Sequence, residues 1–181
     1  MIEITDTGIE GLLVIKPRIF EDERGYFFES YNLNRLKEAG IQNIYVQDNQ
    51  SRSTYGIIRG LHFQKDPKAQ SKIVRVVEGT IFDVAVDLRE DSPTYGEWFG
   101  IELSEENKFQ IFIPKGFAHG FSVLSDTATV VYKCDEFYSQ EHESGIRYND
   151  PDLKIDWKIP SQKITVSEKD NKLGFLSDYK N

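Results

Sequence analysis

The sequence predicts an all-β fold, a jelly-roll barrel with a few short peripheral helices. Runs of β-forming apolar residues recur at roughly even spacing through most of the chain, with turn residues between them. Only one stretch has a convincing helical pattern. The length of 181 residues corresponds to about one domain, and no linker, repeat or low-complexity segment divides the chain. We therefore expect a single domain over residues 1–181.

The N-terminal part is expected to hold two short strands and the helix. Residues 12–15 and 25–31 are apolar and of strand length. Asn32 can cap the helix that follows, and Gly40 can end it. Apolar residues recur along one side of this helix, so we expect that side to face the barrel.

The rest of the chain is predicted to be almost entirely strands. They are expected at residues 44–50, 57–63, 72–77, 80–88, 98–103, 110–113, 117–124 and 127–135. Residues 78–79 are expected to form a tight hairpin turn. In the strand after it, alternation places Asp83 and Asp87 on one face, so one face should be core and the other wet or pocket-lining. The polar tail at residues 144–181 should wrap the barrel as loops and a short helix.

Composition excludes several classes of protein. A formal net charge of -8 argues against a general nucleic-acid-binding surface. No apolar run reaches the length of about 18 residues that a membrane helix needs, and residues 1–6 do not resemble a signal peptide. The single Cys134 cannot form an intrachain disulfide, which agrees with a reducing compartment. We expect a cytoplasmic protein without nucleic-acid or membrane partners, in which a local cationic cluster holds any anionic ligand.

A candidate site begins in residues 56–64, where Arg59 and His62 lie among β-forming apolar residues, and Lys72 follows. Two nearby cations disfavour the protonated form of His62, so it would stay available as a base. Strict alternation would send Arg59 and His62 to opposite faces, so both reach one pocket only if Gly60 permits a bulge. Taken alone, His62 is equally well explained as a hydrogen-bonded structural histidine.

Two later stretches could face this one, residues 114–121 with His119 and residues 130–134 with Tyr132. Alone, His119 is better explained as satisfying a turn, and Tyr132 as a core residue with its hydroxyl at an edge. Together with His62, they predict one pocket for proton transfer on an anionic substrate.

The two histidine stretches resemble the metal-binding motifs of cupins. Gly56, His62 and Gln64 match the start of the first motif, with glutamine where the second histidine would stand, and residues 114–119 match the second motif. The glutamate of the first motif has no counterpart near Lys68. Because tight transition-metal sites usually offer three or four suitable ligands, we expect a cupin-like barrel without a metal or other cofactor.

The chain as a whole resembles the dTDP-4-dehydrorhamnose 3,5-epimerase family. The likeness runs from about Leu12 to about Leu176. Its motifs are RGLHFQ at residues 59–64, KIVRVVEG at 72–79, DVAVDLR at 83–89, PKGFAHGF at 114–121, YKC at 132–134 and NDPDL at 149–153. The resemblance implies a metal-free homodimer that inverts C3 and C5 of dTDP-4-dehydro-6-deoxy-D-glucose. The product would be dTDP-4-dehydro-L-rhamnose, on the pathway to dTDP-L-rhamnose.

The resemblance also implies catalytic roles. His62 would be the base, oriented by Asp170, and Tyr132 the acid on the other side. Lys72, with help from His119, would stabilise the enolate. The chemistry agrees, because a C4 ketone acidifies the hydrogens at C3 and C5 and leaves an enolate oxygen that needs a cation. Inversion needs an acid on the face opposite the base, and an ordinary tyrosine, with a pKa of about 10, is protonated at neutral pH.

Further positions match residues that bind the nucleotide and its phosphates. They are Phe20, Arg24, Glu29, Gln47, Asp48, Asn49, Arg59, Glu143, Lys169 and, as the aromatic stacked on thymine, Tyr138. Since family members exchange N-terminal strands between subunits, Arg24 and Glu29 would serve the neighbour's site. Without the resemblance, Arg24 with Glu29 would be explained as a surface ion pair, Glu143 as part of a solvated loop and Tyr138 as a surface aromatic.

Two other functions stay open on sequence alone. An epimerase that inverts only C3 or only C5 of a related dTDP-deoxysugar would use the same residues. A cupin that binds a sugar nucleotide without turnover is less well supported, because a binder needs no acid and base on opposite walls.

Overall fold

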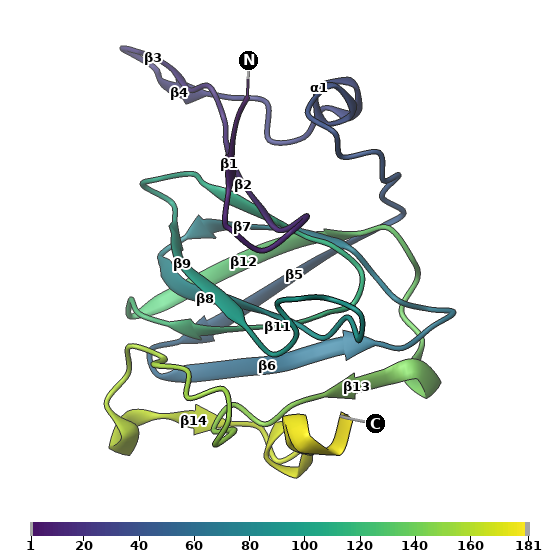
Figure 1. Ribbon diagram of the computed structural model, residues 1–181. Helices are drawn as coiled ribbons and strands as arrows, with labels where there is room; N and C mark the ends of the chain where they lie inside the picture. The colour runs from purple at the N-terminus through teal and green to yellow at the C-terminus, as the bar shows by residue number, and fades with distance from the viewer. Residues whose placement is uncertain (1, 180–181) are drawn as a thin grey trace.

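Two six-stranded sheets face each other and form a barrel in the computed structural model, which describes residues 2–179 (Figure 1). The first sheet has the order β1 (Glu3–Asp6), β2 (Leu13–Lys16), β10 (Gln110–Ile113), β7 (Lys72–Glu78), β12 (Thr127–Cys134) and β5 (Gln47–Thr54). The second has the order β13 (Glu143–Gly145), β6 (Ile57–Gln64), β11 (Phe117–Val123), β8 (Thr80–Asp87) and β9 (Trp98–Ser104), and β14 (Thr165–Val166) pairs with β6 in parallel. The all-β jelly-roll prediction is confirmed.

Helices are few and lie outside the sheets. The helix α1 (Leu33–Glu38) begins as predicted, with the Asn32 side chain accepting hydrogen bonds from two N–H groups of its first turn. The other helices are short 3-10 turns, η1 (Gln140–His142), η2 (Ser161–Lys163), η3 (Asp170–Lys172) and η4 (Leu176–Tyr179). None of the helices within residues 2–179 is both long and apolar enough to cross a membrane.

The main core lies between the two sheets. Val74 and Val130 of the first sheet pack with Ala85 and Phe121 of the second, and all four are almost fully buried. Burial of such side chains is the main force that holds the sheets together. The strands that carry the site residues are therefore supported by a close-packed core.

A second core lies on the outer face of the second sheet. Val84 and Val86 of β8 pack there against Leu153, Trp157 and Leu176 of the C-terminal segment. The tail wraps the barrel as the sequence suggested (Figure 1), but it contains a short strand and 3-10 turns in place of the single short helix that was expected. Because the tail covers this face, β8 is buried on both sides.

This burial corrects one prediction about β8. Neither of its faces is wet, since Asp83 and Asp87 are both fully buried. Hydrogen bonds make that burial possible, because Asp83 accepts from His119 and Asp87 accepts from Arg89 and from two hydroxyl groups.

The turn at Glu78 and Gly79 is also different from the prediction. It is tight, but it does not close a hairpin, because β7 pairs with β10 and β12 whereas β8 pairs with β9 and β11. The chain crosses here from one sheet to the other. Gly79 has a φ of +76°, and a Cβ atom there would lie 2.0 Å from the Thr127 carbonyl oxygen. Only glycine fits such a crossing.

The N-terminal strands shift relative to the prediction. The strand expected at residues 25–31 ends at Phe27, as β4 (Gly25–Phe27), and it pairs with β3 (Phe20–Asp22) in a hairpin that projects beyond the barrel (Figure 1). The strand expected at residues 44–50 is β5, which starts at Gln47 because its mostly polar residues pair along β12. The apolar Ile44 that suggested an earlier start is exposed.

The predicted bulge at Gly60 is present. His119 faces His62 and Phe121 faces Arg59, so two steps along β11 match three along β6. Gly60 has a φ of +113°, and a Cβ atom there would lie 2.6 Å from Gly120 Cα. The extra residue changes the face on which the next side chains of β6 lie.

Candidate active site

A cavity of about 300 Å³ opens at one end of the barrel, between the two sheets. Both sheets and the loops beside them line it, with Gln47, Asn49, His62, Phe63, Gln64, Gln70, Lys72, Tyr132, Tyr138 and Glu143. The structure therefore brings together His62, Lys72 and Tyr132 of the expected proton-transfer pocket, whereas Arg59 and His119 do not line this cavity. His62 comes from the second sheet, whereas Lys72 and Tyr132 come from the first.

His62 is held by a carboxylate from the tail. Its Nε2 lies 2.8 Å from Asp170 Oδ1, and the other carboxylate oxygen accepts the Gly60 N–H at 3.2 Å. Burial raises the pKa of Asp170, but the hydrogen bonds from His62, Gly60 and Ser167 outweigh it, so the net pKa lies below its ordinary value. The ionised carboxylate accepts a hydrogen bond from Nε2–H and leaves Nδ1 as the ring nitrogen that can accept a proton.

Lys72 and Tyr132 lie on neighbouring strands. The Lys72 Nζ is 5.9 Å from the centre of the Tyr132 ring. Burial lowers the pKa of Lys72, and burial raises the pKa of Tyr132. Tyr132 is thus kept as a phenol at neutral pH, while the ammonium group of Lys72 is within reach of the same space.

His119 is not among the residues that line the cavity. It is 7% exposed, and its Nε2 lies 2.8 Å from Asp83 Oδ2. In register it stands opposite His62, so the two histidines occupy adjacent strands. Buried Asp83 therefore satisfies Nε2 of the His119 ring, and His119 does not reach the surface of the cavity.

Three predicted binding residues meet at the rim of the cavity. The Tyr138 hydroxyl donates to Glu143 Oε2 at 2.8 Å, and Lys169 Nζ donates to the same oxygen at 2.6 Å. Burial raises the pKa of Glu143, but the hydrogen bonds from Lys169 and Tyr138 outweigh this effect. The net pKa lies below its ordinary value, so the carboxyl is ionised at neutral pH. Tyr138 is 54% exposed, and an exposed aromatic ring can stack on a base.

Other predicted residues lie away from this cavity within one chain. Asp48 points to the opposite face of β5 from Gln47 and Asn49, and accepts from Lys133 Nζ at 2.8 Å. Arg59 is exposed, and its Nε donates to Ser53 Oγ at 2.9 Å. The bulge at Gly60 therefore does not bring Arg59 into the cavity that His62 lines, contrary to the expectation from the sequence.

The N-terminal candidates are further away. Phe20 and Arg24 lie on the projecting hairpin, where Arg24 pairs with Asp22. Glu29 follows the hairpin and pairs with Arg35 at 2.6 Å. None of the three lines the cavity of its own chain.

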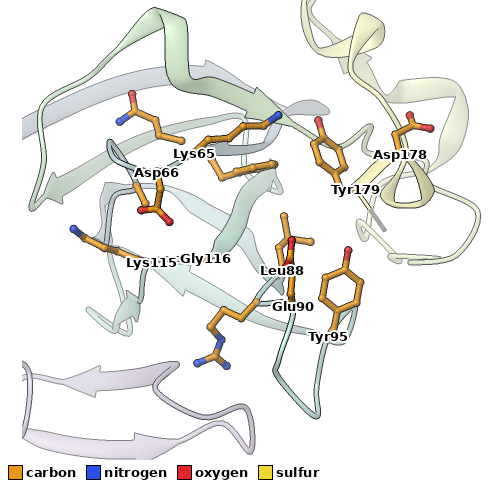
Figure 2. A pocket seen from close by; sticks show the side chains of 13 residues that line it. Lys65, Asp66, Leu88, Glu90, Tyr95, Lys115, Gly116, Asp178 and Tyr179 are labelled. Carbon is orange, nitrogen blue, oxygen red and sulfur yellow. The ribbon is translucent and has the colours of Figure 1, made fainter. Parts of the chain in front are cut away.

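A larger cavity lies elsewhere. It has a volume of about 580 Å³ and lies against the C-terminal turn η4 (Figure 2). Charged groups of both signs, such as Lys65, Lys115 and Glu90, line it together with Tyr95 and Tyr179. It holds no histidine and no predicted site residue, so the smaller cavity is the better candidate for proton transfer.

Sequence reasoning missed several polar residues of the site. Asp83, which holds His119, was assigned only to a face of β8. Gln64 was noted only as a replaced metal ligand, and Gln70 was not considered. A polar residue inside a strand that is otherwise apolar was the available signal for Asp83 and Gln64. Within residues 2–179, no group of three or more His, Cys, Asp or Glu side chains is arranged to hold a metal ion.

Comparisons with known proteins agree with the geometry. A family model described as dTDP-4-dehydrorhamnose 3,5-epimerase matches residues 6–178. A curated dTDP-4-dehydrorhamnose 3,5-epimerase of Methanothermobacter thermautotrophicus is 52% identical over 165 residues, which cover 91% of this chain and 89% of the relative.

Two solved structures are also similar. The dTDP-4-dehydrorhamnose 3,5-epimerase of Elizabethkingia anophelis has a TM-score of 0.94 at 50% identity, over 98% of this chain and 97% of the other. A Legionella pneumophila dTDP-6-deoxy-D-glucose-3,5-epimerase, in complex with dTDP-4-keto-L-rhamnose, has a TM-score of 0.94 at 49% identity, over 98% and 94% of the two chains.

Proposed function

Since the chain belongs to the dTDP-4-dehydrorhamnose 3,5-epimerase family and is an epimerase, we propose that it inverts C3 and C5 of dTDP-4-dehydro-6-deoxy-D-glucose. The product is dTDP-4-dehydro-L-rhamnose, an intermediate of dTDP-L-rhamnose synthesis. One observation carries the proposal. His62 and Tyr132 stand on strands of opposite sheets and line the same cavity, with Lys72 beside them.

In the proposed mechanism, His62 removes the proton. Its Nδ1 takes the proton from C3 or C5. The C–H electron pair then forms a double bond to C4, and the carbonyl electron pair moves to the C4 oxygen, which gives an enolate. Asp170 supports this step because its ionised carboxylate fixes the tautomer of His62 and balances the imidazolium that forms. Lys72 stabilises the negative oxygen with its ammonium group.

Tyr132 returns a proton on the opposite face. Its hydroxyl donates to the carbon, the enolate electrons reform the ketone, and the configuration is inverted. The phenolate then regains a proton from solvent, and His62 releases the one it took, so no atom is gained or lost. Burial keeps the pKa of Tyr132 above its ordinary value, which supports a role as acid.

Recognition of the nucleotide is proposed for the rim and the basic groups around it. Tyr138 stacks on thymine. Arg59 and Lys169 bind the diphosphate, because cationic side chains form strong, charge-assisted hydrogen bonds with phosphate oxygens. Gln47, Asn49 and Glu143 complete the contacts to the sugar and base, whereas His119 does not line the cavity and is assigned no direct contact here. Asp48, which the resemblance also implies, is not included because its carboxylate pairs with Lys133 on the other face of β5.

Phe20, Arg24 and Glu29 support a homodimer, since they lie on or just after a hairpin that projects from its own barrel (Figure 1). We propose that they complete the site of the neighbouring copy. Co-expression of Arg24→Ala with His62→Asn tests this. A heterodimer then holds one intact site, so about a quarter of wild-type activity should return. If the mixture is as inactive as its parents, Arg24 serves its own chain, and if the Arg24→Ala parent is fully active, Arg24 serves no site.

The decisive test of the reaction is deuterium uptake. The purified protein in D₂O should label C3 and C5 of dTDP-4-dehydro-6-deoxy-D-glucose, and NMR of the product should show both centres inverted. His62→Asn should abolish the label at both carbons, and full exchange by this variant would remove His62 from the role of base. Inversion at one centre would identify a mono-epimerase, and nucleotide binding without label would identify a binding protein.

The cytoplasmic location expected from the sequence stays a prediction.

A further inference from the structure

The segment that carries Tyr138 has no strand partner along its length. We call residues 136–139 the rim segment; it follows β12 and precedes η1. Unpaired backbone needs other partners when it is partly buried. Here side-chain oxygens take the N–H groups of three successive residues, with Glu136 accepting from Phe137, Gln47 from Tyr138 and Gln64 from Ser139.

Gln64 is the central partner of this segment. Its Oε1 accepts the Ser139 N–H at 2.6 Å, and its Nε2 donates to the carbonyl oxygens of Phe137 at 3.3 Å and Lys68 at 2.6 Å. Its side chain therefore bonds the residues on both sides of Tyr138. Gln64 is 7% exposed, so water cannot easily replace these bonds.

Gln70 and Gln47 hold the same segment from two other places. Gln70 Nε2 donates to the Glu136 carbonyl oxygen at 2.7 Å. Gln47 Oε1 accepts the Tyr138 N–H at 2.9 Å. All three glutamines also line the cavity, so the groups that fix the rim segment belong to the cavity wall.

A primary amide suits this task because it carries a donor and an acceptor on one head. A glutamate at position 64 could not donate to two carbonyl groups, and a methionine could neither donate nor accept. The amide is also uncharged, so the hold on the segment does not vary with pH near neutrality.

We propose that Gln64 and Gln70 are positioning residues for nucleotide recognition, which act by fixing the backbone on either side of Tyr138. With its backbone held in this way and its hydroxyl bound to Glu143, the Tyr138 ring presents one set face to the flat pyrimidine base of a nucleoside diphosphate. This inference rests on the proposed function, because it takes Tyr138 as the residue on which the base stacks.

The test measures binding apart from turnover. Gln64→Met should weaken dTDP binding by about tenfold in isothermal titration calorimetry and raise KM by a similar factor, as expected for one or two lost hydrogen bonds. Its kcat should stay within about twofold, since His62, Lys72 and Tyr132 keep their places. Gln70→Met, at a less buried position, should have the same effect at a smaller size.

A double-mutant cycle shows whether these glutamines act through Tyr138. In a Tyr138→Ala background, Gln64→Met should lower dTDP affinity by less than about twofold, because the ring it positions is absent. Gln42→Met is the matched control, since that amide donates to the Lys37 carbonyl oxygen at 3.0 Å away from the cavity. It should leave both constants unchanged.

Three outcomes would overturn the inference. They are an equal loss in kcat and kcat/KM for both glutamine variants, an undiminished loss of dTDP affinity in the Tyr138→Ala background, and no loss in either variant. Failure of the proposed reaction would look different, because wild-type protein would then bind dTDP without labelling the keto sugar. If Gln64→Met does not fold, Gln70→Met alone decides.

Discussion

The floor and the rim of the cavity are built in different ways. We call His62, Lys72 and Tyr132 the floor. All three stand on strands that are paired on both sides, so the backbone ladders of the two sheets fix them. The rim segment has no ladder, and side-chain amides hold it instead. Small shifts of the floor would misplace groups that must meet one carbon atom, whereas the rim needs only to present a flat ring. We therefore expect changes in the floor to act on kcat and changes in the rim to act on KM.

After His62→Asn, the largest effect is expected for Tyr132→Phe. Loss of the acid should lower net inversion by about a thousandfold, since general acid catalysis contributes up to about 10⁴-fold. Solvent deuterium should still enter at one carbon, because His62 can remove and return a proton on its own face. NMR of the recovered substrate measures both. Inversion at the wild-type rate would assign the acid to another group.

Asp170→Asn should lower kcat by about a hundredfold. The amide can donate to His62 Nε2, which moves the ring proton to Nδ1 and leaves no acceptor toward the substrate. KM should change little, because Asp170 faces His62 and Gly60 rather than the nucleotide. A rise in KM with normal kcat would place Asp170 in binding.

The alkaline limit of activity should be set by Lys72. Burial lowers its pKa, so it loses its proton at a lower pH than an ordinary lysine, whose pKa is about 10.4. The raised pKa of Tyr132 keeps the acid protonated over the same range. Lys72→Arg should lower kcat by about tenfold and move the alkaline limb of the kcat profile upward. An unmoved limb would exclude Lys72 as its cause.

Changes at the rim should be smaller and should act on KM. Tyr138→Ala removes the proposed stacking platform and should raise KM by about tenfold at nearly constant kcat. Tyr138→Phe, the matched variant, loses only the bond to Glu143 and should raise KM by about twofold to threefold. A fall in kcat as large as the rise in KM would contradict the division between floor and rim.

The smallest effect on turnover is expected for Asp87→Asn. Burial raises the pKa of Asp87, but hydrogen bonds from Arg89, Ser92 and Thr94 outweigh it and bring the pKa to about 2. This lowered value stabilises the fold above a pH of about 4, and the contribution disappears as the pH falls toward 2. The variant should lose about 2 kcal/mol of unfolding free energy at pH 7 and show a flatter acid limb in urea titrations. Its kcat and KM should match wild type.

The floor could be predicted from sequence because its groups interrupt strongly apolar strands. His62, Lys72 and Tyr132 each lie in a run whose β character is clear. The bulge at Gly60 was predicted in order to bring Arg59 and His62 to one pocket; the bulge is present, but Arg59 does not line the cavity. The crossing at Gly79 could not be predicted, because the partners of β7 and β8 are distant in sequence. The burial of Asp83 was hidden for the same reason, because Asp83 lies on the face of β8 that packs inside the barrel, where its partner His119 is 36 residues further along the chain.

The rim was harder to predict. Gln64 and Gln70 bond to backbone groups about seventy residues away, and no local pattern indicates such partners. The resemblance named Asp48 together with its neighbours, but alternation along β5 turns it away from the cavity. The hairpin of β3 and β4 has no contact with the cavity of its own chain, so one chain cannot reveal its role.

The carboxylate beside His62 lies 108 residues further along the chain. The ribosome makes proteins from the N-terminus, so every strand of the first sheet, up to Cys134, is synthesised before Asp170. A nascent barrel therefore carries its imidazole before the group that orients it exists. In the proposed mechanism, a chain that has not yet reached Asp170 lacks the group that fixes the tautomer of His62, so efficient proton removal depends on the tail as well as on the barrel.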